Sequence, residues 1–340
     1  MKFFVTGTAG FIGFHLARRL LKDGHDVVGY DGLTDYYDPA LKRARLAILE
    51  ATQGFTGIEA MLEQKGRLED AIALYGPDVI VHLAAQAGVR YSIENPGAYI
   101  SANLIGTFNL LEAARLYRPR HLMIASTSSV YGGNQKVPFA EADRTDFPVS
   151  LYASTKKSVE AISHSYAHLF EIPTTVMRFF TVYGPWGRPD MALFRFVAAI
   201  EAGKPIAAYG QGAMRRDFTF IDDLIEAVSR LASVMPERGK PLLTDGIVDS
   251  LSPVAPWRVV NIGSGHPIAL TDFIAAIEKT LGKTATNILM PMQAGDVADT
   301  FADPSLLKAL TGYTPTTELA DGIRHFVDWF DDYARRQIAS

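Results

Sequence analysis

The stretch KFFVTGTAGFIGFHLARRLLKDG, residues 2–24, decides the fold of this 340-residue chain. Its apolar beginning, 2–7, predicts a buried strand, and 13–24 has the apolar spacing of an amphipathic helix. Between them, Gly7, Gly10 and Gly13 form a G-x-x-G-x-x-G turn. Glycines there let the backbone turn tightly and approach a phosphate at a helix N-terminus. The stretch predicts the start of a dinucleotide-binding fold, although a tight turn without a ligand uses the same residues.

The alternation of short apolar runs and amphipathic helices continues beyond this stretch. Further strands are predicted at 25–31, 78–85, 121–127 and 174–182, and helices at 103–117 and 152–170. Such alternation predicts an α/β fold in which helices cover both faces of a doubly wound parallel sheet. We expect a Rossmann domain over 1–180 and a smaller α/β domain over 181–340, with about 212–235 packing back on the first domain.

Composition narrows the class of protein. The chain is 48% hydrophobic and 21% charged, which is typical of a globular protein, and its net charge is −4. Because the charges are interspersed, we expect no nucleic-acid or membrane partner. The chain has 0 cysteines, shows no signal peptide at its beginning, and has no apolar run near the ~20 residues that span a bilayer. We expect a cytoplasmic protein.

Asp31 strengthens the prediction of a cofactor site. It ends the second predicted strand, downstream of Gly13. A carboxylate at this place accepts hydrogen bonds from the ribose hydroxyls of NAD and repels the 2′-phosphate of NADP. NAD is therefore the predicted cofactor.

Tyr152 and Lys156 form a candidate catalytic pair. Being four residues apart on one helix, their side chains share a face, and a nearby ammonium favours the phenolate. A phenolate is a usable general base. Thr127 lies in the hydroxyl-rich run ASTSSVYG (125–132), at the predicted carboxyl edge of the sheet, where it could bridge substrate and Tyr152. As a bare pattern, Y-x-x-x-K also occurs on ordinary surface helices.

These residues resemble the extended short-chain dehydrogenase/reductase family and, within it, the UDP-glucuronate 4-epimerases. The resemblance runs nearly end to end. It is carried by the segments DYYDPALKRARL (35–46), HLAAQAGVRYSIENP (82–96), PVSLYASTKK (148–157), RFFTVYGPWGRPDMALF (178–194), RRDFTFIDD (215–223) and GDVADTFAD (295–303).

The resemblance implies roles for further residues. The implied catalytic trio is Thr127, Tyr152 and Lys156. The implied NAD-binding residues are Gly7, Gly10, Phe11, Ile12, Gly13, Asp31, Leu68, Leu83, Ala84, Ala85, Asn103, Tyr152, Lys156 and Phe180. The second domain would bind the UDP-sugar, with Arg90, Arg216 and Asp296 among its contacts. The chain departs from the family pattern at three positions: Arg67 replaces an acidic residue expected to contact adenine, Gly32 replaces a common asparagine after Asp31, and Ala294 replaces a common proline before Gly295.

The implied reaction oxidises the sugar at carbon 4, turns the 4-keto intermediate and reduces it on its other face. With a uronate this intermediate is a β-keto acid that loses carbon dioxide unless its carboxylate is held. We expect Arg188 to hold it, since a guanidinium matches a carboxylate in a bidentate fashion, with help from Thr181 and from Ser128 or Ser129. A surface arginine beside a structural turn is the alternative.

Several alternatives stay open from the sequence. An epimerase of another UDP-sugar and a UDP-glucuronate decarboxylase share most of the motifs, and a non-catalytic NAD-sensing protein is a more distant alternative. His164 and His168 have helical spacing but lack the acidic residue of a zinc motif, so no metal site is expected. The apolar faces of 103–117 and 152–170 could pair across a two-fold axis, as the resemblance implies for a homodimer, and burial within one chain is the alternative.

Overall fold

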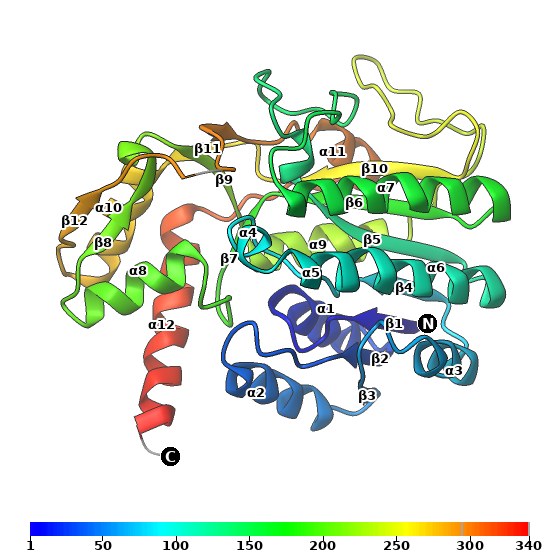
Figure 1. Ribbon diagram of the computed structural model, residues 1–340, viewed down its shortest axis with the longest axis horizontal. Coiled ribbons are helices and arrows are strands. Elements are labelled where there is room, and N and C mark those ends of the chain that lie inside the picture. The colour runs from blue at the N-terminus through cyan, green and yellow to red at the C-terminus, as the bar shows by residue number, and fades with distance from the viewer. Residues whose placement is uncertain (294, 339–340) are drawn as a thin grey trace.

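The structure is a computed structural model that describes residues 1–293 and 295–338, so Ala294 lies outside the described residues. A seven-stranded sheet with the order β3-β2-β1-β4-β5-β6-β10 forms its centre (Figure 1). All neighbouring strands run parallel. They are β1 (Lys2–Thr6), β2 (Asp26–Asp31), β3 (Phe55–Glu59), β4 (Val79–His82), β5 (His121–Thr127), β6 (Thr174–Phe179) and β10 (Trp257–Ile262). The order confirms the predicted doubly wound α/β fold.

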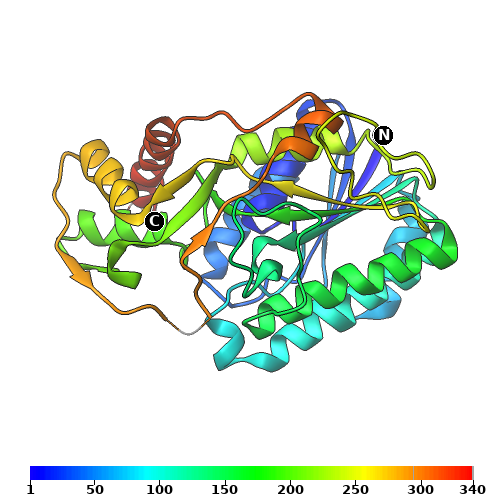
Figure 2. The ribbon, with the colours of Figure 1, turned by 90° about the horizontal axis from the view of Figure 1, so that it is seen from above.

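Helices cover both faces of this sheet (Figure 2). Alternate strand residues point to opposite faces, so Phe3 and Val5 enter one apolar core and Phe4 enters the other. The first face carries α1 (Phe11–Lys22), α2 (Pro39–Glu50), α9 (Ile221–Leu231) and α11 (Ser305–Thr311). The second carries α3 (Lys65–Tyr75), α6 (Gly106–Tyr117) and α7 (Leu151–Phe170). The two apolar cores therefore hold both helix layers against the sheet.

The later part of the chain forms a smaller α/β region beside that edge (Figure 1). Its main sheet holds β7 (Thr181–Tyr183), β9 (Arg215–Phe220), β11 (Pro267–Ala269) and β13 (Asp299–Thr300), and a second pair is β8 (Ile206–Ala208) with β12 (Asn287–Leu289). Its helices are α8 (Ala192–Glu201), α10 (Leu270–Leu281) and α12 (Leu319–Ile338). The chain enters this region directly from β6, so the start of β7 adjoins the sheet edge.

Some elements differ from the sequence analysis. The chain returns from the second region to add β10 to the first sheet, a strand that the sequence analysis did not foresee. The predicted strand 78–85 ends at His82, and the predicted helix 103–117 begins with a π-helical turn, Ile100–Ile105. Short turns complete the chain: α4 (Tyr91–Glu94), α5 (Pro96–Tyr99) and the 3-10 turns Ser128–Tyr131 and Tyr209–Gly212.

The described residues contain no helix that is both long and apolar enough to cross a bilayer. His164 and His168 lie on α7, where they hold the loop that precedes β10. His164 bonds the Ser252 hydroxyl at 2.8 Å, and His168 bonds the Val254 carbonyl oxygen at 2.7 Å.

Candidate active site

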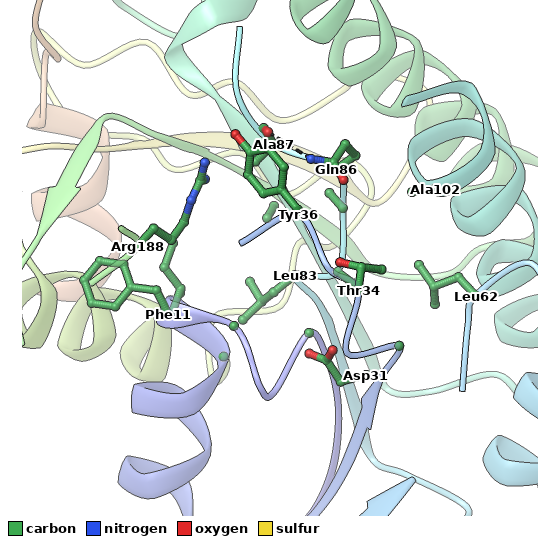
Figure 3. Close-up of a pocket in the computed structure, with 18 of the residues that line it drawn as sticks. Phe11, Asp31, Thr34, Tyr36, Leu62, Leu83, Gln86, Ala87, Ala102 and Arg188 are labelled. Atoms are coloured by element: carbon green, nitrogen blue, oxygen red, sulfur yellow. Dashed lines mark hydrogen bonds between the residues drawn. The ribbon is translucent and has the colours of Figure 1, made fainter. Parts of the chain in front are cut away.

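A cavity of about 280 Å³ opens at the carboxyl ends of the first sheet's strands (Figure 3). Ligands bind at this edge in doubly wound sheets. The structure brings most of the predicted cofactor and catalytic residues together in its lining: Gly7, Gly10, Phe11, Ile12, Gly13, Asp31, Leu83, Ala84, Ala85, Thr127, Tyr152, Lys156, Phe180 and Arg188.

Two glycines in the loop between β1 and α1 have no room for a side chain. Gly7 has a φ of +79°, and a Cβ there would lie 2.8 Å from the Ala84 nitrogen. A Cβ on Gly13 would lie 2.0 Å from the Gly7 carbonyl oxygen. The loop backbone therefore meets the N-terminus of α1, whose first N–H groups have no partner within the helix. This cradle fits a pyrophosphate.

Asp31 is fixed beside this cradle, at the end of β2. One carboxylate oxygen accepts a hydrogen bond from the Ala9 amide at 2.9 Å, and the other accepts one from the Leu33 amide at 2.8 Å. Each carboxylate oxygen has two acceptor sites, so both can accept another donor. A carboxylate held here fits ribose hydroxyls and disfavours a 2′-phosphate, so the residues present fit NAD.

The loop after β3 differs from the sequence analysis. The cavity is lined there by Ala60, Met61, Leu62 and Glu63. Leu68, which the resemblance placed at the cofactor, lies instead in the core on α3, and Arg67 is on the same helix. The reason is where β3 ends: because its last residue is Glu59, the chain is already helical from Lys65 and turns away from the sheet edge.

Asn103 lies behind the wall of the cavity. It is 1% exposed. Its side-chain oxygen accepts from the Gln86 amide at 2.8 Å, and its nitrogen donates to the Gln86 carbonyl oxygen and the Thr155 hydroxyl, each at 3.0 Å. The structure therefore shows Asn103 fixing the loop after β4, whose residue Gln86 lines the cavity.

Tyr152 and Thr127 meet because the first turn of α7 packs beside the carboxyl end of β5. Tyr152 is the second residue of α7, and the Ser150 hydroxyl caps this helix by accepting from the Ala153 amide at 3.1 Å. Burial raises the pKa of Tyr152, while its hydrogen bond with Thr127 and the positive charge of Arg188 lower it. The positive charge of Arg188 therefore favours the phenolate of Tyr152.

Lys156 follows one helical turn later and is 5% exposed. Its ammonium donates to the Ala125 carbonyl oxygen at 2.9 Å, near the carboxyl end of β5. Burial lowers the pKa of Lys156 to about 8, and the negative charge of Glu160 opposes that shift. The ammonium is therefore anchored to the strand that carries Thr127.

A buried ion pair supports this helix from behind. Arg178 on β6 donates to both carboxylate oxygens of Glu160, at 2.9 and 2.8 Å, and the Ser126 hydroxyl donates to the same carboxylate at 2.6 Å. Side-chain exposure is 4% for Arg178 and 1% for Glu160. Because every charge is paired, the pair fixes α7 against β5 and β6.

Arg188 projects into the cavity from the turn after β7, toward the ring of Tyr36 and away from Asp31 (Figure 3). Its guanidinium donates to both oxygens of Asp190, at 3.0 and 2.5 Å, and the Tyr36 hydroxyl donates to Asp190 at 3.1 Å. The bidentate pair with Asp190 balances the charge of Arg188, whose side chain is half-buried. Arg188 is thus oriented by a carboxylate of this chain.

The other residues predicted at the sugar carboxylate lie at the edge of this site. Thr181 begins β7 and lines a smaller cavity, which shares Phe11, Val182, Arg188 and Met191 with the first one. Ser129 accepts a hydrogen bond from the Thr127 hydroxyl at 3.2 Å, and Ser128 begins the turn that follows β5. Among the described residues, neither serine belongs to the lining of the two cavities.

The residues predicted at the nucleotide form a separate group. Arg90 lies 3.4 Å from the Asp296 carboxylate and covers the ring of Tyr209, with 4.5 Å between its guanidinium carbon and the ring centroid. Arg216 donates to the carbonyl oxygens of Val297 and Ala298, at 2.7 and 2.8 Å. Two arginines and an aromatic ring from separate segments are thus gathered beside Asp296.

Sequence reasoning missed a group of residues that the segment after β2 adds to the cavity. They are Thr34, Tyr36, Tyr37 and Lys42. The available signal was the aromatic pair Tyr36-Tyr37 in the segment 35–46, which carried the family resemblance but received no role.

Comparisons with known proteins agree with this geometry. Residues 3–241 match the model of the NAD dependent epimerase/dehydratase family. The chain is 56% identical to a probable UDP-glucuronate 4-epimerase of Rhizobium meliloti (strain 1021), over 99% of this chain and 98% of that protein. It is 42% identical to UDP-glucuronate 4-epimerase 4 of Arabidopsis thaliana, over 97% of this chain and 75% of the relative.

The fold comparison points the same way. The chain resembles the crystal structure of the UDP-glucuronic acid 4-epimerase from Bacillus cereus in complex with UDP-glucuronic acid and NAD. The TM-score is 0.87 at 34% identity, over 98% of this chain and 100% of that one.

Proposed function

This chain belongs to the NAD dependent epimerase/dehydratase family, and from that premise we propose that it is an isomerase that interconverts UDP-glucuronate and UDP-galacturonate through a 4-keto intermediate. The relatives named above act on the same sugar nucleotide. The observation that carries the proposal is that Arg188 lies in the same cavity as Tyr152 and Lys156. The guanidinium that would bind the sugar carboxylate thus shares a cavity with the two side chains that would take part in oxidation at carbon 4.

The chain supplies the proton chemistry. When bound, NAD would supply a reversible acceptor for the hydride of carbon 4. Tyr152 takes the proton of the 4-hydroxyl and gives it back after the sugar turns, so the reaction involves no net oxidation. Thr127 orients that hydroxyl. Lys156, fixed on the Ala125 carbonyl oxygen one helical turn from Tyr152, would add positive charge near the phenol and would hydrogen-bond the cofactor ribose.

The carboxylate is handled at the other end of the cavity. Loss of carbon dioxide from the β-keto acid would leave its electron pair on the sugar, so an ion pair that holds the carboxylate in its charged form opposes this loss. Arg188 performs this role, with Thr181 and the serines 128 and 129 as candidate partners from neighbouring turns. The residues from 181 onward also bring Arg216 and Asp296, which we assign with Arg90 to the UDP moiety.

One observation favours a second candidate, 4-epimerisation of a neutral UDP-sugar. Arg188 is already paired with Asp190. A neutral sugar would therefore not leave the half-buried guanidinium without a counterion, which is the usual source of discrimination at such a site. The Arg188–Asp190 pair permits neutral substrates and leaves the preference to be decided by competition between the two carboxylates.

We further assign this enzyme to the cytoplasm as a homodimer. The support for a dimer is apolar surface on the two helices of the second face. Exposed fractions are 44% for Phe108 and 53% for Leu116 on α6, and 67% for Leu169 on α7. Pairing these faces across a two-fold axis would cover them. Size-exclusion chromatography with light scattering gives the mass that decides this assignment.

The direct test is to incubate the purified protein with UDP-glucuronate and NAD and to follow the sugar by NMR. UDP-galacturonate as the product supports the proposal. A UDP-pentose identifies a decarboxylase, and bound NAD without any change of the sugar identifies a sensor. Turnover of UDP-glucose alone identifies the neutral-sugar epimerase.

A further inference from the structure

Arg45 on α2 is the largest fully buried side chain of the described chain, at 0% exposure. It is not in the lining of the main cavity as the described residues form it. None of the described carboxylates lies within ion-pair distance of its guanidinium, and its Nε has no hydrogen-bond partner. Burial lowers its pKa. A buried cation without a paired carboxylate is costly, so its position calls for an explanation.

One branch of the guanidinium holds the cofactor loop. Nη1 donates to the Ala9 carbonyl oxygen at 2.9 Å and to the Tyr37 hydroxyl at 2.7 Å. Ala9 lies between Gly7 and Gly10, and its amide donates to Asp31 at 2.9 Å. The Ala9 peptide groups are therefore fixed on one side by Asp31 and on the other by Arg45.

The other branch holds the turn that carries Arg188. Nη2 donates to the carbonyl oxygens of Trp186 and Gly187, at 2.5 and 3.3 Å. Trp186 has a φ of +59°, a conformation that L-residues rarely adopt and that surrounding contacts must maintain. His15 on α1 adds one such contact, at 2.9 Å from the Pro185 carbonyl oxygen. Gly187, the residue before Arg188, is thus held in place by a side chain of α2.

We propose that Arg45 is a positioning residue that joins the cofactor loop to the turn of Arg188, so that recognition of the substrate carboxylate depends on it. The inference rests on the proposed function. The planar fork suits this task, because its two nitrogens reach acceptors on opposite sides. A lysine can reach only one of the two sides, since its donors share one nitrogen.

The test compares Arg45→Met and Arg45→Lys with the matched control Arg43→Met, which changes an exposed arginine of the same helix. Calorimetry measures the dissociation constants of NAD, UDP-glucuronate and UDP-glucose, in a Tyr152→Phe background that prevents turnover. Both Arg45 variants should weaken UDP-glucuronate about tenfold while UDP-glucose changes less than about twofold, and Arg45→Met should also weaken NAD about fivefold. Arg43→Met should change none of these constants.

Three results overturn the inference. The first is equal weakening of both sugar nucleotides, which would mean that Arg45 serves only the general shape of the site. The second is unchanged binding, and the third is failure of both variants to fold, which would make Arg45 a residue of the fold alone. Arg45→Lys guards against the last of these, since it keeps the charge and one side of the contacts. If the unsubstituted protein does not prefer UDP-glucuronate to UDP-glucose, the proposed function fails first, and this result is visible before any Arg45 variant is measured.

Discussion

The cofactor end of the cavity is built mainly from backbone, whereas the sugar end is built from side chains. The first consists of Gly7, Gly13, the N-terminus of α1 and one carboxylate, Asp31. The second depends on Arg188, which a turn after β7 presents and which residues of the segment after β2 surround. Substitutions at the cofactor end should therefore act sterically, by blocking the backbone cradle. Substitutions at the sugar end should act through charge, by removing the cation or its competing carboxylate.

Substitution of Tyr152, the proposed general base, should have the largest effect. Tyr152→Phe removes the phenol that takes the proton, so kcat should fall by about a thousandfold while UDP-sugar binding persists. Initial rates by NMR and calorimetric binding give the two values. Retention of more than about a tenth of the rate would remove Tyr152 from the role of general base.

Gly13→Ala tests the steric nature of the cofactor end. The added methyl group would lie 2.0 Å from the Gly7 carbonyl oxygen, so the loop must shift and NAD binding should weaken by at least about a hundredfold. Calorimetric titration with NAD measures the loss. Gly66→Ala is the matched control, because a Cβ there meets nothing within 4 Å. Normal NAD affinity in Gly13→Ala would show that the loop is not a cradle for phosphate.

Arg188→Ala tests the charge at the other end. It removes the bidentate donor and leaves Asp190 without its partner, so the KM for UDP-glucuronate should rise by about a hundredfold. The fraction of UDP-pentose among the products should rise as well. Arg195→Ala changes an exposed arginine on α8 and should leave both values unaltered. An unchanged KM in Arg188→Ala would contradict the assignment.

Asp190→Asn sharpens the comparison further. Without the competing carboxylate, Arg188 should bind the substrate carboxylate about three- to tenfold more tightly, and a neutral UDP-sugar should gain nothing. Steady-state KM values for both substrates measure this, with Asp35→Asn, an exposed neighbour of Tyr36, as control. A higher KM for UDP-glucuronate in Asp190→Asn would instead show that Asp190 is needed mainly to hold Arg188 in place.

The smallest expected effect is the contribution of Lys156 to the pH dependence of the free energy of unfolding. Its pKa is about 8 in the folded chain and near its ordinary value, 10.5, after unfolding, so the unfolded chain binds more protons between these values. The free energy of unfolding should therefore rise with pH in this window, and Lys156→Met should lose part of that rise. Urea titrations at pH 7.5 and 9.5 measure it, with the exposed Lys204→Met as control. Equal pH dependence in both variants would contradict the lowered pKa.

The same contrast explains what could be predicted from the sequence. The glycine turn, Asp31 and the spacing of Tyr152 and Lys156 follow from local geometry, and the structure places them in one cavity. Leu68 was placed wrongly because the sequence does not mark where β3 ends. Tyr36 and Arg45 received no role, because their contacts join residues far apart in the chain, as in the bond from Arg45 to Trp186. Asp190 received none either, although it pairs with Arg188 only two residues away.

The most direct measurement is a competition in one tube. Equal amounts of UDP-glucuronate and UDP-glucose are incubated with the enzyme and NAD, and NMR follows both sugars. If Arg188 recognises the sugar carboxylate, the enzyme should convert UDP-glucuronate to UDP-galacturonate at least about a hundredfold faster than it converts UDP-glucose, and no UDP-pentose should form. Equal or faster conversion of UDP-glucose would contradict the assignment of this site to a uronate.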